Sequence, residues 1–344
     1  MKRCIAFLFI SALLSSGCAS TWKPEIISGV AGLQWPFSPD KAKVTHMMTL
    51  TGFQENVSMS TLFRSITFGE GTEDGFVAPV AISIGNDKRI AIADTGCRCV
   101  HLFIPSGEQY RKISSTGPQN LISPVGVAFD EALSLYVSDS ALGKILVFDR
   151  DGKFLFSFGN DYETPLKRPT GLAYNDKDKL LYIADTLENK IYAADQTGKL
   201  VFSFGERGAE KGQFNFPVHI FWSSAEIYVV DTLNFRVQVF DSSGGYLNSF
   251  GQHGDGSGDF ALSKGIAVDK DGIIYVVDNL FDNVQLFDKK GNFLLTLGSR
   301  GSGQGEFWMP SGLFADNTGR LYVCDTYNRR IQVFQITENY SGEN

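Results

Sequence analysis

The sequence lacks a surplus of positive charge. It contains 31 Lys and Arg against 38 Asp and Glu, which gives a formal net charge of −7. A protein that binds nucleic acid through its phosphates needs clustered Lys and Arg. The composition therefore argues against a nucleic-acid partner.

The N-terminal region lacks an apolar run long enough to be a permanent membrane span. Its apolar stretch, 5–14, has ten residues, and a spanning helix needs about 20. Lys2 and Arg3 precede this stretch, and small residues at 15–17 follow it, directly before Cys18. This order is typical of a secretory signal that is removed from the mature protein.

The small residues ending in Gly17-Cys18 resemble a bacterial lipoprotein signal. The resemblance implies cleavage after residue 17 and lipidation of Cys18, which would anchor the chain stably in a membrane. Ser15 stands where such signals usually have Leu, so an ordinary secretory signal is the alternative. Ala19, in place of the Asp of inner-membrane retention, favours the outer membrane. The mature chain then carries a formal charge of about −9.

One phrase recurs in units of 45 to 48 residues: an apolar, β-branched run that ends in Asp, as in Ile227–Thr232. A fixed period of this length indicates a repeat architecture in which each unit packs only on its neighbours. Around the phrase, each unit has four short strand patterns separated by Gly- and Asp-rich turns, and no helical periodicity. Four antiparallel strands per unit predict the blades of an all-β propeller. The six repeated aspartates are Asp94, Asp139, Asp185, Asp231, Asp278 and Asp325.

The pattern from Phe216 to Gly251, with YVVDTLNFRVQVFD at its centre, resembles a copy of the NHL repeat. The resemblance covers about residues 62–336 and implies a six-bladed β-propeller. We expect a linker at 18–43, the propeller at 44–336 and a tail at 337–344. The last unit lacks a fourth strand, so an N-terminal segment must supply it and close the ring. Val44–Gly52 and Phe63–Gly69 are both candidates, and the first is slightly favoured.

The repeated Asp invites a catalytic interpretation, but a structural one is stronger. Four of the six units carry Lys or Arg five residues after the Asp. A carboxylate at the end of a strand can accept loop N–H groups and pair with this cation. We therefore interpret the Asp as a latch that recurs because the blade recurs.

Binding residues are expected on the face that carries the loops between second and third strands, where the units differ most. Aromatic and Arg side chains are enriched in protein-binding surfaces. Phe214, Phe260 and Phe307 occupy equivalent positions and are interpreted as packing residues. The candidates for binding a protein partner are Arg98, Phe235, Phe281, Tyr327, Arg329 and Trp308.

A second candidate group is a polar cluster at the axis. His219 stands two positions after the leading Pro of its unit, where the other units have Gly or Ala. The predicted cluster consists of Thr170, His219, Lys264 and Ser311, and it would hold an anion or water or simply fill a solvated channel. Zinc lyases of the NHL class carry His directly after the leading Pro, and this chain has none there, so no metal or cofactor is expected.

Cysteine is scarce, with five residues in the chain. Beyond the signal and Cys18, the sequence has Cys97, Cys99 and Cys324, and no Cys-x-x-Cys-His motif for covalent haem. Cys97 and Cys99 lie in the first unit and Cys324 in the last, which are neighbours in a closed ring. A bridge from Cys324 to Cys97 or Cys99 is possible and would lock this closure, but a small, buried apolar Cys324 without a bridge is the favoured interpretation.

Together these features predict a lipid-anchored propeller of the bacterial cell envelope that binds a protein partner and is not an enzyme. One alternative is a propeller hydrolase or lyase with His219 as base and Lys264 as electrostatic support. A second alternative is a binder of envelope carbohydrate.

Overall fold

The computed structural model describes residues 21–37, 40–56 and 73–337. The predicted signal, Cys18 and the candidate segment 63–69 lie outside these ranges, as does the predicted tail except for Thr337. The described residues form strands and two short 3-10 helices, η1 (Pro105–Gly107) and η2 (Thr232–Asn234). None of the helices in this part of the chain is long and apolar enough to cross a membrane.

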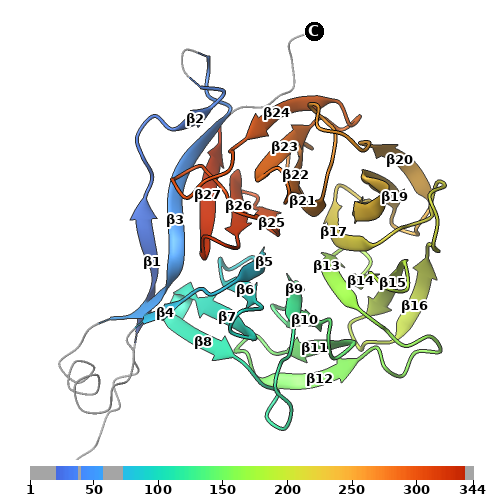
Figure 1. Cartoon of the computed structure of the whole chain (residues 1–344). Helices are drawn as coiled ribbons and strands as arrows, with labels where there is room; N and C mark the ends of the chain where they lie inside the picture. The colour runs from blue at the N-terminus through green and yellow to red at the C-terminus, as the bar shows by residue number, and fades with distance from the viewer. Residues whose placement is uncertain (1–20, 38–39, 57–72, 338–344) are drawn as a thin grey trace, which may run out of the picture.

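Five antiparallel, four-stranded sheets follow one another along the chain, as expected for propeller blades. Each blade runs from an innermost strand outward, and the sheets are arranged around a central axis (Figure 1). Blade 1 consists of β5 (Pro79–Ile84), β6 (Ile90–Asp94), β7 (Cys99–Ile104) and β8 (Gln109–Ile113), and blade 2 of β9 (Pro124–Phe129), β10 (Leu135–Asp139), β11 (Lys144–Phe148) and β12 (Phe154–Phe158). Blade 3 consists of β13 (Pro169–Asn175), β14 (Leu180–Asp185), β15 (Lys190–Asp195) and β16 (Leu200–Phe204), and blade 4 of β17 (Pro217–Ser223), β18 (Glu226–Asp231), β19 (Arg236–Asp241) and β20 (Tyr246–Phe250). Blade 5 consists of β21 (Ser263–Val268), β22 (Ile274–Asp278), β23 (Asn283–Phe287) and β24 (Phe293–Leu297).

The sixth sheet joins the two ends of the chain, and we call it the terminal sheet. It contains β25 (Leu313–Ala315), β26 (Arg320–Asp325) and β27 (Arg330–Ile336) from the C-terminal end. From the N-terminal end, β3 (Val44–Glu55) runs antiparallel to β27. This strand contains the first of the two segments considered from the sequence.

The described residues of the segment predicted as a linker contain strands. β1 (Trp22–Ser28) pairs along β3 as the outermost strand of the terminal sheet, and β2 (Gln34–Trp35) and β4 (Glu73–Gly75) also pair with β3. The Trp22 ring packs 4.7 Å from the ring of Tyr110 on β8. β1 is ordered because β3 is long enough to leave unpaired backbone groups at its outer edge, and β1 satisfies them.

The core is divided into six apolar clusters, each lying between two neighbouring sheets. The middle strands of each blade are apolar on both faces because each face meets a different neighbour. Phe214, Phe260 and Phe307 have 0% exposure in three of these clusters. Their interpretation as packing residues is confirmed.

Neighbouring inner strands approach one another closely around the axis. A Cβ atom on Gly171 would lie 2.6 Å from the Cα of His219 and 2.8 Å from the backbone nitrogen of Ile220. This separation is shorter than any ordinary van der Waals contact, so only Gly fits there without a backbone shift. The small residues two positions after the leading Pro are therefore explained by the crowding of the inner strands.

Candidate functional site

The repeated aspartates lie at one end of the ring, which we call the loop face. Each ends the second strand of its sheet, and all six are 0% exposed. Asp139, for example, accepts hydrogen bonds from the backbone nitrogens of Ile122, Ser123, Ala141 and Leu142. The carboxylate therefore fixes two loops, as the latch interpretation predicts.

Within the described residues, two of these aspartates form an ion pair with the predicted cation. Arg236 Nε lies 2.9 Å from Asp231 Oδ2, and Arg330 Nε lies 2.7 Å from Asp325 Oδ2. In blade 1 the side chain beside the carboxylate is His101, seven residues after the Asp, with its Nε2 atom 3.6 Å from Asp94 Oδ2. The latch is thus constant in its backbone hydrogen bonds and variable in its side-chain partner.

Two positions of the repeat place large apolar side chains in solvent on the loop face. One is the residue two after the Asp, and the other is the residue two before the leading Pro of the unit. Seven of the fourteen exposed large apolar side chains in the described part of the chain are at these positions. We call this group the apolar ring; it consists of Val77, Ile122, Leu187, Leu233, Leu280, Trp308 and Tyr327, which are 42–62% exposed.

Two of the predicted binding residues form a pair within the apolar ring. The rings of Trp308 and Tyr327 lie 5.6 Å apart and are 43% and 56% exposed. Arg98 and Arg329 are also exposed at the loop face.

The remaining two predicted binding residues, Phe235 and Phe281, are only partly accessible. Phe235 packs with its centroid 4.4 Å from that of His253. Phe281 lines a shallow depression beside Asp255 and Gly256. Phe235 and Phe281 are therefore less accessible to a partner than Trp308 and Tyr327.

The predicted axial cluster is divided by the alternation of side chains along the inner strands. Thr170 and Ser311 use their hydroxyls within the framework: Thr170 Oγ1 lies 3.0 Å from Thr186 Oγ1, and Ser311 Oγ lies 2.7 Å from Thr326 Oγ1. Burial, together with the charge of Arg168, lowers the pKa of Lys264. His219, in contrast, lines a cavity that none of the other three residues reaches.

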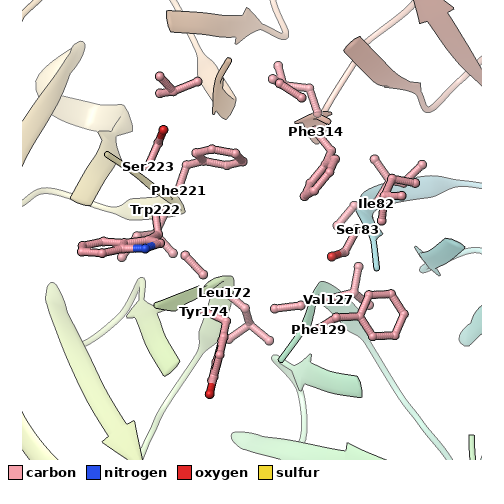
Figure 2. A pocket seen from close by; sticks show the side chains of 18 of the residues that line it. Ile82, Ser83, Val127, Phe129, Leu172, Tyr174, Phe221, Trp222, Ser223 and Phe314 are labelled. Atoms are coloured by element: carbon pink, nitrogen blue, oxygen red, sulfur yellow. The ribbon is translucent and has the colours of Figure 1, made fainter. Parts of the chain in front are cut away.

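This axial cavity opens at the end of the ring opposite the loop face, because the second halves of the inner strands line it. Its volume is about 290 Å³. Figure 2 shows Phe221 of β17 and Phe314 of β25 pointing toward its centre, and their rings lie 6.1 Å apart in an edge-to-face arrangement. Its other labelled walls are Ile82, Ser83, Val127, Phe129, Leu172, Tyr174, Trp222 and Ser223.

His219 is a half-buried polar side chain of this cavity. Its Nδ1 atom is enclosed and has no hydrogen-bond partner. Burial lowers the pKa of its imidazole from 6.5 to about 4. The side chain is therefore neutral at pH 7, with an unused hydrogen-bonding atom next to apolar walls.

The possible bridge from Cys324 to Cys97 or Cys99 is not formed, in agreement with the favoured interpretation of Cys324. Cys97 and Cys99 form a disulfide with each other, and Cys324 is a buried free thiol. Arg98 between them has φ 54°, and this left-handed turn brings their Cα atoms to 5.3 Å. Cys324 instead lies in the apolar cluster between the terminal sheet and blade 1. Burial is the main reason that the pKa of its thiol is raised well above its usual value.

Two features were not predicted from the sequence. The axial cavity has only a weak signal, namely aromatic residues near the ends of four inner strands: Phe129, Tyr174, Phe221 with Trp222, and Phe314. The second feature is a cluster of Cys97, Cys99 and His101, whose side-chain N and S atoms all lie within 4.8 Å of one another. Its signal was readable, because alternate residues along a strand point to the same face.

Comparison with known families and structures supports the propeller fold. A family model described as 6-bladed beta-propeller matches residues 210–280 and 270–344. No curated protein matches the sequence.

Among solved structures, virginiamycin B lyase from Staphylococcus aureus is similar, with a TM-score of 0.60, 12% identity, and coverage of 92% of this chain and 100% of that chain. A gluconolactonase from Xanthomonas campestris gives a TM-score of 0.58 and 16% identity, and covers 76% of this chain and 87% of its own. Hydrazine synthase from Kuenenia stuttgartiensis gives a TM-score of 0.54 and 12% identity, and the match covers 79% of this chain and 99% of that chain. At these identities the likeness concerns the fold alone.

Proposed function

We propose that this chain is a lipid-anchored, NHL-type, six-bladed propeller, closed by β3 and acting as a non-catalytic protein-binding module of the bacterial envelope. The observation that carries the proposal is the apolar ring. Monomeric surfaces rarely gather so many large apolar side chains at one end, and such gatherings mark interaction sites.

The chemistry of the loop face indicates the kind of partner. Trp308 and Tyr327 supply exposed aromatic area, and Trp and Tyr are common among the residues that dominate binding energy. Arg98, Arg168 and Arg329 are exposed on the same face. The surface therefore fits a protein segment that presents apolar side chains together with acidic ones.

The alternative enzyme fits the geometry less well. His219 has a pKa of about 4, and general bases work best when the pKa lies near the working pH. Lys264, its proposed electrostatic support, is absent from the residues that line the cavity with His219. The two residues therefore do not form a convergent catalytic pair.

Photo-crosslinking in the envelope tests the protein-binding function. A photoreactive amino acid is placed at Leu233 or Leu280 and, as matched controls, at Leu155 or Leu247. The controls are 51% and 49% exposed, but they lie on outer strands away from the loop face. We expect one discrete protein adduct from the loop-face set alone, weakened at least tenfold by adding Trp308→Ala and Tyr327→Ala. Equal adducts from both sets, or none in envelopes that retain the protein, would overturn the proposal; adducts to glycan would favour the carbohydrate alternative.

A second candidate function is small-molecule binding in the axial cavity, favoured by its aromatic walls and the unpartnered His219 nitrogen. Ligand sites are typically apolar cavities with a few polar groups, and about 290 Å³ suits a small aromatic compound that can hydrogen-bond to His219. Trp222 lines the cavity and serves as a fluorescent reporter. Heteroaromatic fragments should alter the Trp fluorescence of the wild type. They should not alter that of a double variant that combines Ser83→Trp with Trp222→Phe, because its new indole fills the axial cavity. Identical responses in both proteins would eliminate this site.

A further inference from the structure

Blade 1 differs chemically from the other sheets at the side-chain partner of its repeated Asp. In blade 4 and the terminal sheet, an Arg five residues after the Asp and a Gln seven residues after it both contact the carboxylate. Gln238 Nε2 lies 3.1 Å from Asp231 Oδ2, and Gln332 Nε2 lies 3.0 Å from Asp325 Oδ2. Blade 1 has Cys99 and His101 at these two positions. The stabilising groups of the latch are replaced by groups that bind metals.

The cluster of Cys97, Cys99 and His101 is compact and enclosed. The Cys97 and Cys99 sulfurs lie 3.7 Å and 3.5 Å from His101 Nε2. Asp94 Oδ2 lies 3.6 Å from the same nitrogen. Cys99, His101 and Asp94 are 0% exposed, whereas Cys97 is partly exposed at the loop face. The three side chains thus converge on one point, and Cys97 is the member of the cluster nearest to solvent.

The surroundings of His101 orient its Nε2 atom toward the sulfurs. Its Nδ1 atom lies 2.8 Å from the Tyr110 hydroxyl oxygen. Asp74 hydrogen-bonds to that hydroxyl, so the hydroxyl proton is directed to the carboxylate and the oxygen can accept Nδ1–H. A His held at Nδ1 by a hydroxyl offers Nε2 to a metal ion once Nε2 carries no proton, which is the usual arrangement around metal-binding His residues. Phe53 and Phe76 pack around the imidazole and exclude water.

We propose that blade 1 contains a redox-controlled site for a thiophilic metal ion, Zn²⁺ in the first instance. In the reduced protein the ligands would be Cys97, Cys99 and His101, with Asp94 Oδ2 as the fourth. Zn–S bonds of about 2.3 Å and Zn–N bonds of about 2.05 Å in a tetrahedron separate S from N by about 3.6 Å. In the disulfide state of the structure both sulfurs already lie at about this separation from His101 Nε2, at 3.5 Å and 3.7 Å, so metal binding requires them to move apart from each other rather than toward the imidazole.

The disulfide and the metal exclude one another. Two thiolates on one tetrahedral Zn²⁺ lie about 3.8 Å apart, so the S–S bond must be broken first. A dithiol reductant would transfer two electrons and two protons to the disulfide, giving two thiols and leaving the reductant as a cyclic disulfide. Zinc would then displace one proton from each thiol. In an oxidising compartment the disulfide is the resting state, and metal binding reports a loss of oxidising conditions.

The test uses the full-length chain, oxidised or reduced with a phosphine that does not bind zinc strongly. Zinc is titrated by calorimetry, and Co²⁺ is used as a spectroscopic probe for thiolate charge-transfer and tetrahedral ligand-field bands. We expect one equivalent of metal bound by the reduced protein, and at least 100-fold weaker binding by the oxidised protein. Binding of equal strength in both states, or the absence of thiolate–cobalt bands in the reduced state, would overturn the proposal.

Three variants separate a metal site from a disulfide that only stabilises the turn. His101→Gln installs the residue that blades 4 and 5 and the terminal sheet carry at this position, so the blade should fold and the disulfide should form, while zinc affinity falls at least 100-fold. Tyr110→Phe removes the hydroxyl that holds Nδ1 and should weaken zinc by about 10- to 100-fold. Cys324→Ala removes the buried free thiol and should leave zinc binding unchanged. Zinc binding by folded His101→Gln at wild-type strength, or its loss in Cys324→Ala, would assign the metal to other residues and overturn the proposal.

Discussion

Thr326 Oγ1 donates a hydrogen bond of 2.8 Å to the carbonyl oxygen of Pro79, although 247 residues separate them in the sequence. The bond joins the terminal sheet to the inner strand of blade 1. Equivalent bonds join blade 3 to blade 4 through Thr186 and Pro217, and blade 4 to blade 5 through Thr232 and Ser263. The residue directly after the repeated Asp thus connects neighbouring sheets around the axis.

Replacing Thr326 with Val should destabilise the protein by about 1–3 kcal/mol, because it leaves the buried Pro79 carbonyl without this donor. Thr186→Val and Thr232→Val should cost similar amounts, since each breaks the same kind of contact. Urea unfolding of the three variants measures the change, with the exposed Thr164→Val as a control near zero. A negligible cost at Thr326 alone would mean that this contact does not contribute to stability.

Gly171→Ala should destabilise the protein by about 1–3 kcal/mol through overpacking of two inner strands. The new methyl group would collide with the backbone of His219, which cannot move without shifting blade 4. Gly75→Ala is the matched control, because the nearest atom to its Cβ would be 3.8 Å away. Thermal unfolding should show a clear decrease for the first variant and a change within about 0.5 kcal/mol for the second.

Arg330→Ala should lower the free energy of unfolding by about 3 kcal/mol, because it leaves the buried Asp325 carboxylate without its cation. Arg330 NH2 also donates to the Glu306 carbonyl, so its loss loosens the loop before β25. Lys190 holds the equivalent position in blade 3, and no ion pair joins it to Asp185 among the described contacts. Lys190→Ala should therefore have little effect, and equal losses in both variants would contradict the assignment.

His219 should make stability depend on pH in the acidic range. Its folded-state pKa of about 4 lies below the unfolded value of 6.5, so the unfolded chain binds the extra proton first. The contribution to stability is fully present above pH 6.5 and decreases as the pH falls toward 4, by at most about 3 kcal/mol. Denaturation curves from pH 7 to pH 4 should decline less steeply for His219→Ala than for the wild type. Parallel curves would show that the imidazole titrates alike in both states.

The repeat made the strands and the latch predictable because their signals are local. Alternating apolar residues, turn residues and the terminal Asp recur in each unit, so one unit predicts the others. His219 was also recognisable as a departure from Gly at its position. Its surroundings were not, because the cavity is formed by strands from different sheets, and Phe221 and Phe314 are 93 residues apart in the numbering.

The sequence by itself determined the repeat, the strand order within each blade and the apolar faces that pack between sheets, because these depend on side-chain alternation over a few residues. The tertiary structure decided which distant groups meet. It placed β1 on β3, opened the axial cavity away from the loop face and paired Cys97 with Cys99 rather than with Cys324. These outcomes depend on backbone turns, such as the left-handed one at Arg98, and on the packing of separate sheets, and neither is encoded in the repeat pattern.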